Sequence, residues 1–182
     1  MKLRRLFFAA VLVSCSLATY ASDDITFFKG KSVIFLPDGR SFPGGELLLR
    51  RTLRSSAGLI EEVLVSSDHR PNHPARKFIV EMFVEEGEFK MRETQGAFNG
   101  TGKLIGSPWH WVGWSSTSIL PDGTRVESED TLYEQTLVAR KTVFNPTGAV
   151  QIKIEETLEK INESEFDTRV KAMMSSNSNT AK

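Results

Sequence analysis

The feature that most constrains the fold is a series of short runs in which apolar and polar residues alternate with a period of two. The runs are rich in Val, Ile, Phe, Thr and Leu, and Pro, Gly, Asn and Asp separate them. Such alternation is typical of β-strands that bury one face. Because no run shows a helical period, we predict an all-β domain, an antiparallel meander that closes into a β-barrel, with a β-sandwich as the alternative. The predicted strands cover 31–36, 45–54, 59–66, 77–86, 88–98, 101–106, 109–119, 124–134, 137–144 and 149–160.

The alternation also predicts which side chains point into the domain. In 77–86 the inward positions are Phe78, Val80, Met82 and Val84. In 45–54 they are three leucines, and one charged residue shares their face. The four residues are Leu47, Leu49, Leu53 and Arg51.

The first 21 residues have the order of an export signal. Lys2, Arg4 and Arg5 precede an apolar stretch from Leu6 to Val13, which is too short for a spanning helix of about 20 residues. We therefore predict a signal peptide over 1–21, a β-barrel domain over 22–165 and a disordered tail over 166–182.

Two cleavage sites compete within this signal. The sequence of residues 12–15 resembles the lipobox of bacterial lipoproteins, in which the cysteine, here Cys15, is lipidated and becomes the mature N-terminus. That interpretation predicts an exported protein whose membrane partner is reached through a lipid anchor. Since Ser16 replaces the aspartate associated with inner-membrane retention, the resemblance implies the outer membrane, facing the periplasm. The alternative is ordinary cleavage after Ala21, which would release a soluble periplasmic or secreted protein.

The charge composition argues against nucleic acid as a partner. Without the three cations that precede Cys15, 20 Lys and Arg face 23 Asp and Glu, a net charge of about −3. This balance provides no electrostatic footprint for nucleic acid. No cysteine follows Cys15, so the mature domain has no intrachain disulfide and depends on its core. The sequence does not specify an oligomeric state.

Several segments carry a family resemblance. They are 28–30, 106–111, 122–123, 130–133 and 158–161, with the sequences FKG, GSPWHW, DG, DTLY and LEKI. With these segments the chain resembles the lipocalin-like (calycin) class, and in particular a group of uncharacterised bacterial lipocalin-like lipoproteins. The resemblance covers most of the mature chain and implies a barrel. The chain departs from true lipocalins because Lys31 and Ser32 follow Gly30 where a Gly-x-Trp is usual, and no helix is expected after the last strand.

The aromatic segment 109–114 is the most conspicuous candidate site. Trp109 and Trp111 would share one face of a strand, and His110 and Trp114 the other. Aromatic side chains line many ligand pockets, so this strand could form the wall of an apolar cavity, or the same rings could fill the core. The tentative ligand-binding residues are Trp109, Trp111, Trp114, His110, Arg51, Phe78, Met82 and Tyr133.

Other candidate chemistry is weaker. Arg51, a charge on an apolar face, could bind a ligand carboxylate or lie with its head in water. His69 and His73 lie in a proline-containing loop, so we expect no metal and no cofactor. Asp130 lies with Glu127 and Glu129 on one strand, which is more typical of an exposed acidic face than of a catalytic pair. No catalytic residue is predicted.

The leading hypothesis is an envelope lipoprotein that binds a small apolar or lipid-like ligand in a barrel cavity. The first alternative is a structural or interaction protein of the envelope, in which the barrel is filled and an exposed patch binds a partner. The second alternative is an enzyme whose site is not recognised, with perturbed titratable groups around His110 or Asp130.

Overall fold

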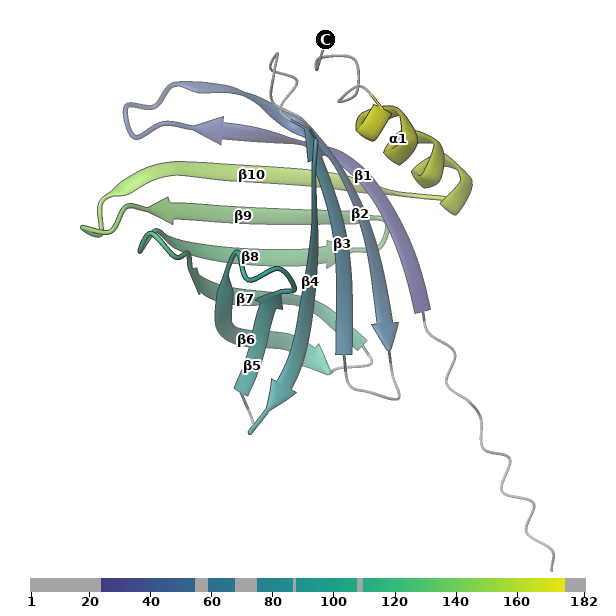
Figure 1. The fold of residues 1–182 in the computed structure, drawn as a ribbon, viewed down its shortest axis with the longest axis horizontal. Coiled ribbons are helices and arrows are strands. Elements are labelled where there is room, and N and C mark those ends of the chain that lie inside the picture. Colours follow the sequence, from purple (N-terminus) through teal and green to yellow (C-terminus); the bar gives the residue numbers. More distant parts are fainter. Residues whose placement is uncertain (1–23, 55–58, 68–74, 87, 108–109, 176–182) are drawn as a thin grey trace, which may run out of the picture.

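The computed structural model describes residues 24–54, 59–67, 75–86, 88–107 and 110–175. The signal segment with Cys15 lies outside them. The described residues form ten strands and one helix, and the strands close into a barrel (Figure 1). The strands are β1 (Asp24–Phe35), β2 (Ser41–Arg54), β3 (Leu59–Ser67), β4 (Arg76–Glu85), β5 (Glu88–Glu93), β6 (Asn99–Ser107), β7 (His110–Ile119), β8 (Arg125–Tyr133), β9 (Thr136–Phe144) and β10 (Val150–Ile161).

Each strand pairs antiparallel with the next strand along the chain, and β1 pairs with β10 to close the barrel. The predicted meander barrel is thereby confirmed over the sandwich. The topology gives the barrel two ends. The mouth end carries the turns of residues 36–40, 94–98, 120–124 and 145–149. The N-terminal end is where β1 begins and the even-numbered strands finish.

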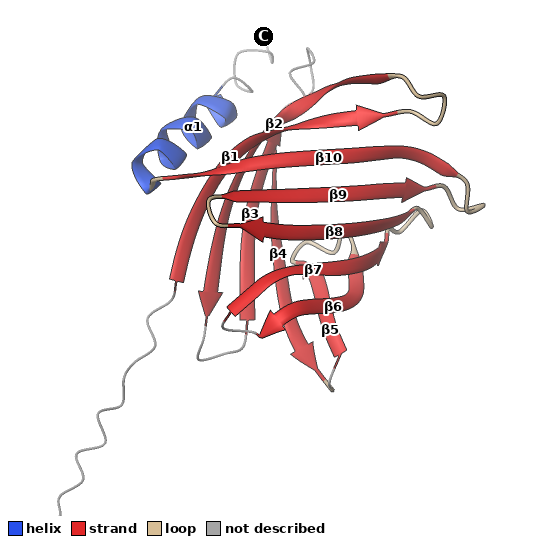
Figure 2. Cartoon of the chain, turned by 180° about the vertical axis from the view of Figure 1, so that it is seen from behind, coloured by secondary structure: helices blue, strands red, loops and turns tan. Residues whose placement is uncertain are grey.

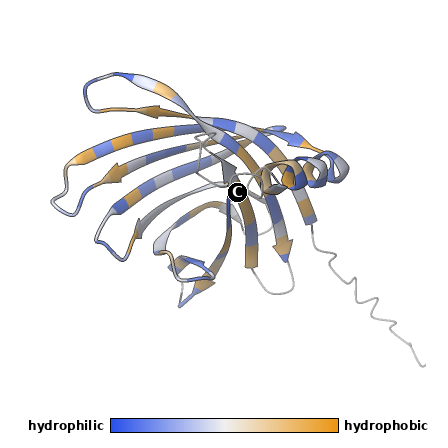
Figure 3. Cartoon of the chain, turned by 45° about the horizontal axis from the view of Figure 1, so that its top comes forward, coloured by the Kyte–Doolittle hydropathy of each residue, from blue (hydrophilic) through white to orange (hydrophobic). Residues whose placement is uncertain are grey.

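The inner face follows the predicted alternation, which Figure 3 shows as changing hydropathy along the strands. Phe28, Leu49 and Leu158 are buried in one inner cluster, and Ile60, Met82 and Trp114 belong to a second. Of the inward positions predicted in β4, Val84 is 53% exposed because it lies near the end of its strand.

The sequence pattern predicts no helix, and this is wrong. Residues 163–175, most of which fall in the predicted disordered tail, form α1 (Glu163–Ser175), which lies outside the barrel against β1 and β2 (Figure 2). The helix buries a further core, outside the barrel, between its own inner face and the outer face of the sheet. This outer core contains Leu48, Val65, Ala75, Phe166 and Met173. No helix in the described part of the chain is long and apolar enough to cross a membrane.

Local signals explain where α1 begins. The Asn162 side chain accepts a hydrogen bond of 2.9 Å from the backbone N–H of Glu165, which is an N-cap interaction. Glu165 in turn accepts a hydrogen bond of 2.8 Å from Lys29 of β1. Phe166 packs on Phe27 with their ring centroids 5.1 Å apart. The cap, the ion pair and the ring contact together fix the first turn against the sheet.

The first strand begins at Asp24, seven residues before the predicted start. Phe27 and Phe28 are adjacent, and both are covered: Phe28 by the inner core and Phe27 by α1. This burial on both faces hides the alternation on which the prediction depends. Further along β1, a Cβ on Gly30 would lie 2.0 Å from the Thr157 carbonyl oxygen of β10. Only glycine allows the two strands to approach this closely where the barrel closes.

Candidate ligand-binding site

A cavity of about 230 Å³ lies inside the barrel, on its mouth side. Phe98 and Leu120 adjoin the turns at that end, so the cavity extends to the mouth. Most of its wall is apolar and comes from inward positions of β3, β4, β5, β7 and β8 and from two turns at the mouth. The apolar lining residues are Leu64, Phe78, Val80, Met91, Phe98, Trp114, Leu120 and Val126.

The remaining lining is polar, and most of its members lie on adjacent strands. Trp114 of β7, Asp130 of β8, Ala139 of β9 and Glu156 of β10 are successive partners in one row across the sheet. Ala139, between the two carboxylates of this row, carries only a methyl group and is buried. The polar lining residues are Glu62, Ser118, Ser128, Asp130 and Lys141.

Arg51 and Glu62 form a buried ion pair at this site. The Arg51 Nε donates a hydrogen bond of 2.5 Å to Glu62 Oε1, and the guanidinium lies 4.7 Å from the centre of the Trp114 ring. Arg51 is 3% exposed and is not among the lining residues. Stacking on the indole and pairing with Glu62 both stabilise the buried cation.

Lys141 and Glu156 form a second internal pair. The Lys141 Nζ lies 2.7 Å from each carboxylate oxygen of Glu156. Burial lowers the pKa of Lys141, but the carboxylates of Glu156 and Asp130 outweigh burial and raise it above its usual value. Lys141 is therefore a charged ammonium at neutral pH.

Asp130 is the fifth charged group of this cluster and lacks a pair of its own. It is 8% exposed and lines the cavity, and it has no hydrogen bond or salt bridge with any residue that the structure describes. Burial raises its pKa to about 7. Lys141 and Arg51 oppose that rise, whereas Glu62 and Glu156 add to it. Each of the two ion pairs is neutral, so an ionised Asp130 leaves the cluster with one excess negative charge.

The lining hydroxyls are not arranged for nucleophilic catalysis. Ser118 Oγ donates to the Met91 sulfur at 3.4 Å, and Ser128 Oγ lies 2.8 Å from Ser116 Oγ. Neither contact is with a group that could accept a proton as a general base. Within the described ranges, no three His, Cys, Asp or Glu residues are placed to hold a metal ion. The arrangement is a cavity with apolar walls and a charged floor.

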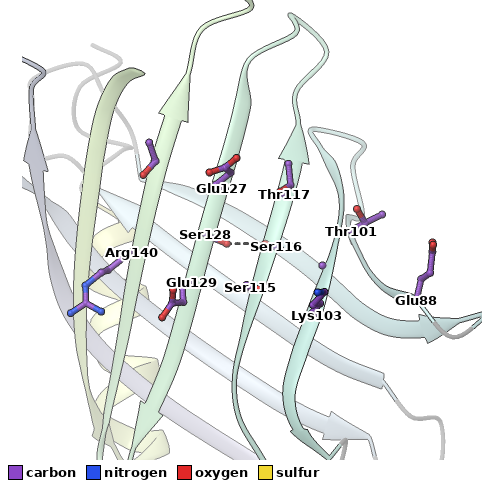
Figure 4. Close-up of a pocket in the computed structure, with 12 residues that line it drawn as sticks. Glu88, Thr101, Lys103, Ser115, Ser116, Thr117, Glu127, Ser128, Glu129 and Arg140 are labelled. Carbon is purple, nitrogen blue, oxygen red and sulfur yellow. Dashed lines mark hydrogen bonds between the residues drawn. The ribbon is translucent and has the colours of Figure 1, made fainter. Parts of the chain in front are cut away.

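A larger depression of about 860 Å³ lies on the outer face of β6 to β9 (Figure 4). Its lining includes the hydroxyl side chains of Thr101 and Thr117 and charges of both signs, among them Glu127, Glu129 and Arg140. No aromatic side chain lines it. We favour the smaller internal cavity as the candidate ligand site because it lies inside the barrel and combines apolar walls with a few placed polar groups.

The structure distributes the predicted site residues unevenly. Trp114 and Phe78 line the cavity together, and Arg51 lies on the inner face as the alternation predicts, although it pairs with Glu62. Met82 does not line the cavity, because it is packed on all sides in the core beside Trp114. Tyr133 is 57% exposed because it is the last residue of β8.

The other predicted positions cannot be compared. Trp109, His69 and His73 lie outside the described residues, and so do the side chains of His110 and Trp111 at the start of β7. Cys15 also lies outside them.

The sequence-based prediction misses the charged floor. It assigns Asp130 to an exposed acidic face with Glu127 and Glu129, but the two glutamates point outward and Asp130 points inward. The alternation along the strand could have identified Asp130 as an inward residue. It is two residues from Ser128 and four from Val126, which also line the cavity, and such spacing places all three on one face. Lys141, which pairs with Ser128 across the sheet, has the same inward parity in β9.

Comparison of the chain with protein-family models and with curated protein sequences finds no match. Function is therefore inferred from the barrel and from the chemistry of its cavity.

Proposed function

We propose that this protein is an exported, lipid-anchored barrel that binds a small amphipathic molecule in its internal cavity. One observation carries the proposal: the cavity joins a wall of eight apolar side chains to a floor of buried charges that includes Asp130. An apolar body would cover the wall and displace water from it, while a polar group would reach the floor.

The size of the cavity limits the ligand. A volume of about 230 Å³ equals about eight water molecules at ~30 Å³ each. It is smaller than the ~300–1,000 Å³ typical of sites for drug-sized molecules. The rest of the inner face is packed by two clusters around Phe28 and Met82. The ligand is therefore on the scale of a six- to eight-carbon chain or a small ring system.

The buried charges favour a ligand-binding barrel over a filled barrel with a purely structural role. Replacing buried ion pairs with well-packed apolar residues is often neutral or stabilising, by about 1–4 kcal/mol. A barrel that had only to fold could dispense with Asp130 and with the Lys141–Glu156 pair. Retention of five charged groups beside a cavity is more simply explained by recognition of a ligand.

The membrane anchor is the second part of the proposal. The lipobox-like segment ending at Cys15 supports lipidation, and nine further residues bring the chain to Asp24, a reach of at most about 30 Å. Because β1 begins at the N-terminal end, the anchor would join the barrel at the end opposite the mouth. Cell fractionation tests this part: we expect Cys15→Ala to move the protein from the membrane to the soluble fraction. An unchanged membrane fraction would contradict lipidation.

Ligand binding is tested by NMR on protein labelled with ¹³C at the methionine methyl groups, titrated with hexan-1-ol. We expect a saturable shift of Met91, which lines the cavity, and little change at Met174, which is on the surface. Val126→Phe, which places a phenyl ring in the cavity, should weaken the shift, and Val112→Phe, at a half-exposed position, should preserve it. No Met91 shift in the wild type, or an equal shift in Val126→Phe, would remove the proposal.

A further inference from the structure

Resting on the proposed function, we propose that the ligand carries a cationic amine, whose ammonium group forms an ion pair with Asp130. Three features of the cavity carry this inference. They are the unbalanced carboxylate, the position of a second carboxylate, and the way in which the cavity's cation is already held.

The first feature is the charge count. Arg51 is paired with Glu62, and Lys141 is paired with Glu156. Asp130 has no such partner among the described residues, although it is buried beside them. A buried carboxylate must either take up a proton or acquire a cation. An ammonium group entering the cavity would supply that cation and leave the cluster neutral.

The second feature is the position of Glu62. This residue lines the cavity from β3, whereas Asp130 lines it from β8. The two carboxylates therefore face the same cavity, and the charge of Glu62 contributes to the raised pKa of Asp130. An ammonium group has three N–H donors and can serve both carboxylates and the Ser128 hydroxyl. The apolar wall around Phe78 and Met91 would hold the hydrocarbon part.

The third feature excludes an anionic head group. Lys141 is the cation that lines the cavity in the described part of the chain, and both oxygens of Glu156 hold its ammonium. A carboxylate or phosphate entering here would meet Asp130 and Glu62 as well as Lys141. Like charges in an enclosed site repel strongly, so an anion would bind more weakly than a neutral isostere.

The pairing makes binding depend on pH. The charged groups that act on Asp130 are Lys141 on β9, Glu156 on β10, Glu62 on β3 and Arg51 on β2, and the uncharged Trp114 is its partner on β7. An alkylamine stays protonated below about pH 10, like the lysine side chain. Below pH 7 Asp130 holds a proton that the ammonium must displace, so affinity should rise from about pH 5 to 7 and then level off.

Isothermal titration calorimetry with hexylamine, hexan-1-ol and hexanoate tests the inference, because the three probes share one chain length and differ in head group. At about pH 7.5 we expect the full chain to bind hexylamine at least about tenfold more tightly than hexan-1-ol, and hexanoate most weakly. Asp130→Asn should lose the preference for the amine and keep its affinity for the alcohol. The matched control is Glu129→Gln, an outward neighbour that should retain the preference.

The outcomes separate the two proposals. Equal affinity for hexylamine and hexan-1-ol in the wild type would overturn the inference that the ligand carries an amine and would leave the proposed function standing. An amine preference that persists in Asp130→Asn, with thermal unfolding showing the variant to be folded, would overturn the proposed ion pair with Asp130 and likewise leave the proposed function standing. Failure of both probes to bind the wild type would remove the proposed function, and the amine with it.

Discussion

Lys141 on β9 donates hydrogen bonds of 2.7 Å to both carboxylate oxygens of Glu156 on β10, inside the barrel. Glu156 lies in the same row across the sheet as Asp130, which faces the cavity. Because Glu156 already neutralises Lys141, the charge of Asp130 is left over. This relationship connects the stability of the barrel to the chemistry proposed for its ligand.

Breaking this pair should destabilise the barrel. Glu156→Gln removes the carboxylate that accepts both hydrogen bonds of the buried Lys141 ammonium and leaves Asp130 as the charge that balances it, so we expect a loss of about 1–3 kcal/mol. Urea unfolding at neutral pH measures the loss. The neighbouring Glu155→Gln is the control, because its pair with Arg140 is 3.8 Å long and more than half exposed, so its removal should cost less than about 1 kcal/mol. Equal losses for the two variants would contradict the account of the interior pair.

The double variant Lys141→Met with Glu156→Leu should be more stable than Glu156→Gln alone. Replacing both charges with apolar side chains of similar size removes the desolvation cost of the pair and leaves neither of its partners charged and unpaired. The same urea titrations give the comparison. A double variant whose loss equals the summed losses of Lys141→Met and Glu156→Leu, each measured alone, would show that the residues act independently.

Asp130 should make stability fall as the solution becomes less acidic. Its pKa is about 7 in the folded chain and close to 3.8 when exposed, so the folded state binds the proton more tightly. The stabilising contribution is therefore complete below about pH 4 and declines until about pH 7, by about 4 kcal/mol in total. Asp130→Asn imitates the protonated form, so it should match the wild type near pH ~4 and be more stable near pH ~8. Unfolding curves under both conditions test this, and a variant less stable than the wild type on the alkaline side would contradict it.

The helix α1 should contribute to stability through one side of its last turns. Met173 is 7% exposed in the outer core, and the adjacent Met174 is 40% exposed. Met173→Ala should cost about 2–5 kcal/mol, because it empties space beneath the helix, whereas Met174→Ala should cost little. Thermal or urea unfolding distinguishes them. Similar stability of the two variants would mean that α1 does not pack on the barrel as described.

The strand pattern predicts the barrel because the inner face alternates with solvent along most strands. Prediction fails where both faces are covered. Leu48 is fully buried under α1 although Leu47 and Leu49 face the inner core, so the three leucines show no alternation. Such a run in an otherwise alternating strand indicates a covering element. Here that element is α1, whose buried positions Phe166 and Met173 are too few to produce a strong helical period.

The cavity could be predicted only in part. Trp114 and Phe78 are identified because aromatic residues at inward positions are conspicuous in sequence. The position of Asp130 is not predicted, because the nearby Glu127 and Glu129 make the whole segment resemble an exposed acidic face. Composition alone does not show that Asp130 points to the opposite side of the strand from these two glutamates. Pairing of Arg51 with Glu62 and of Lys141 with Glu156 depends on strand register, which the single sequence does not fix.

The most direct test of the central claim is native mass spectrometry of the full chain purified from its own host, with Val126→Phe measured in parallel. We predict that the wild type carries one small molecule per chain and that Val126→Phe, in which a phenyl ring occupies part of the cavity, carries less. Identical masses for the two proteins, after correction for the substitution, would contradict the claim that the barrel interior is a ligand site.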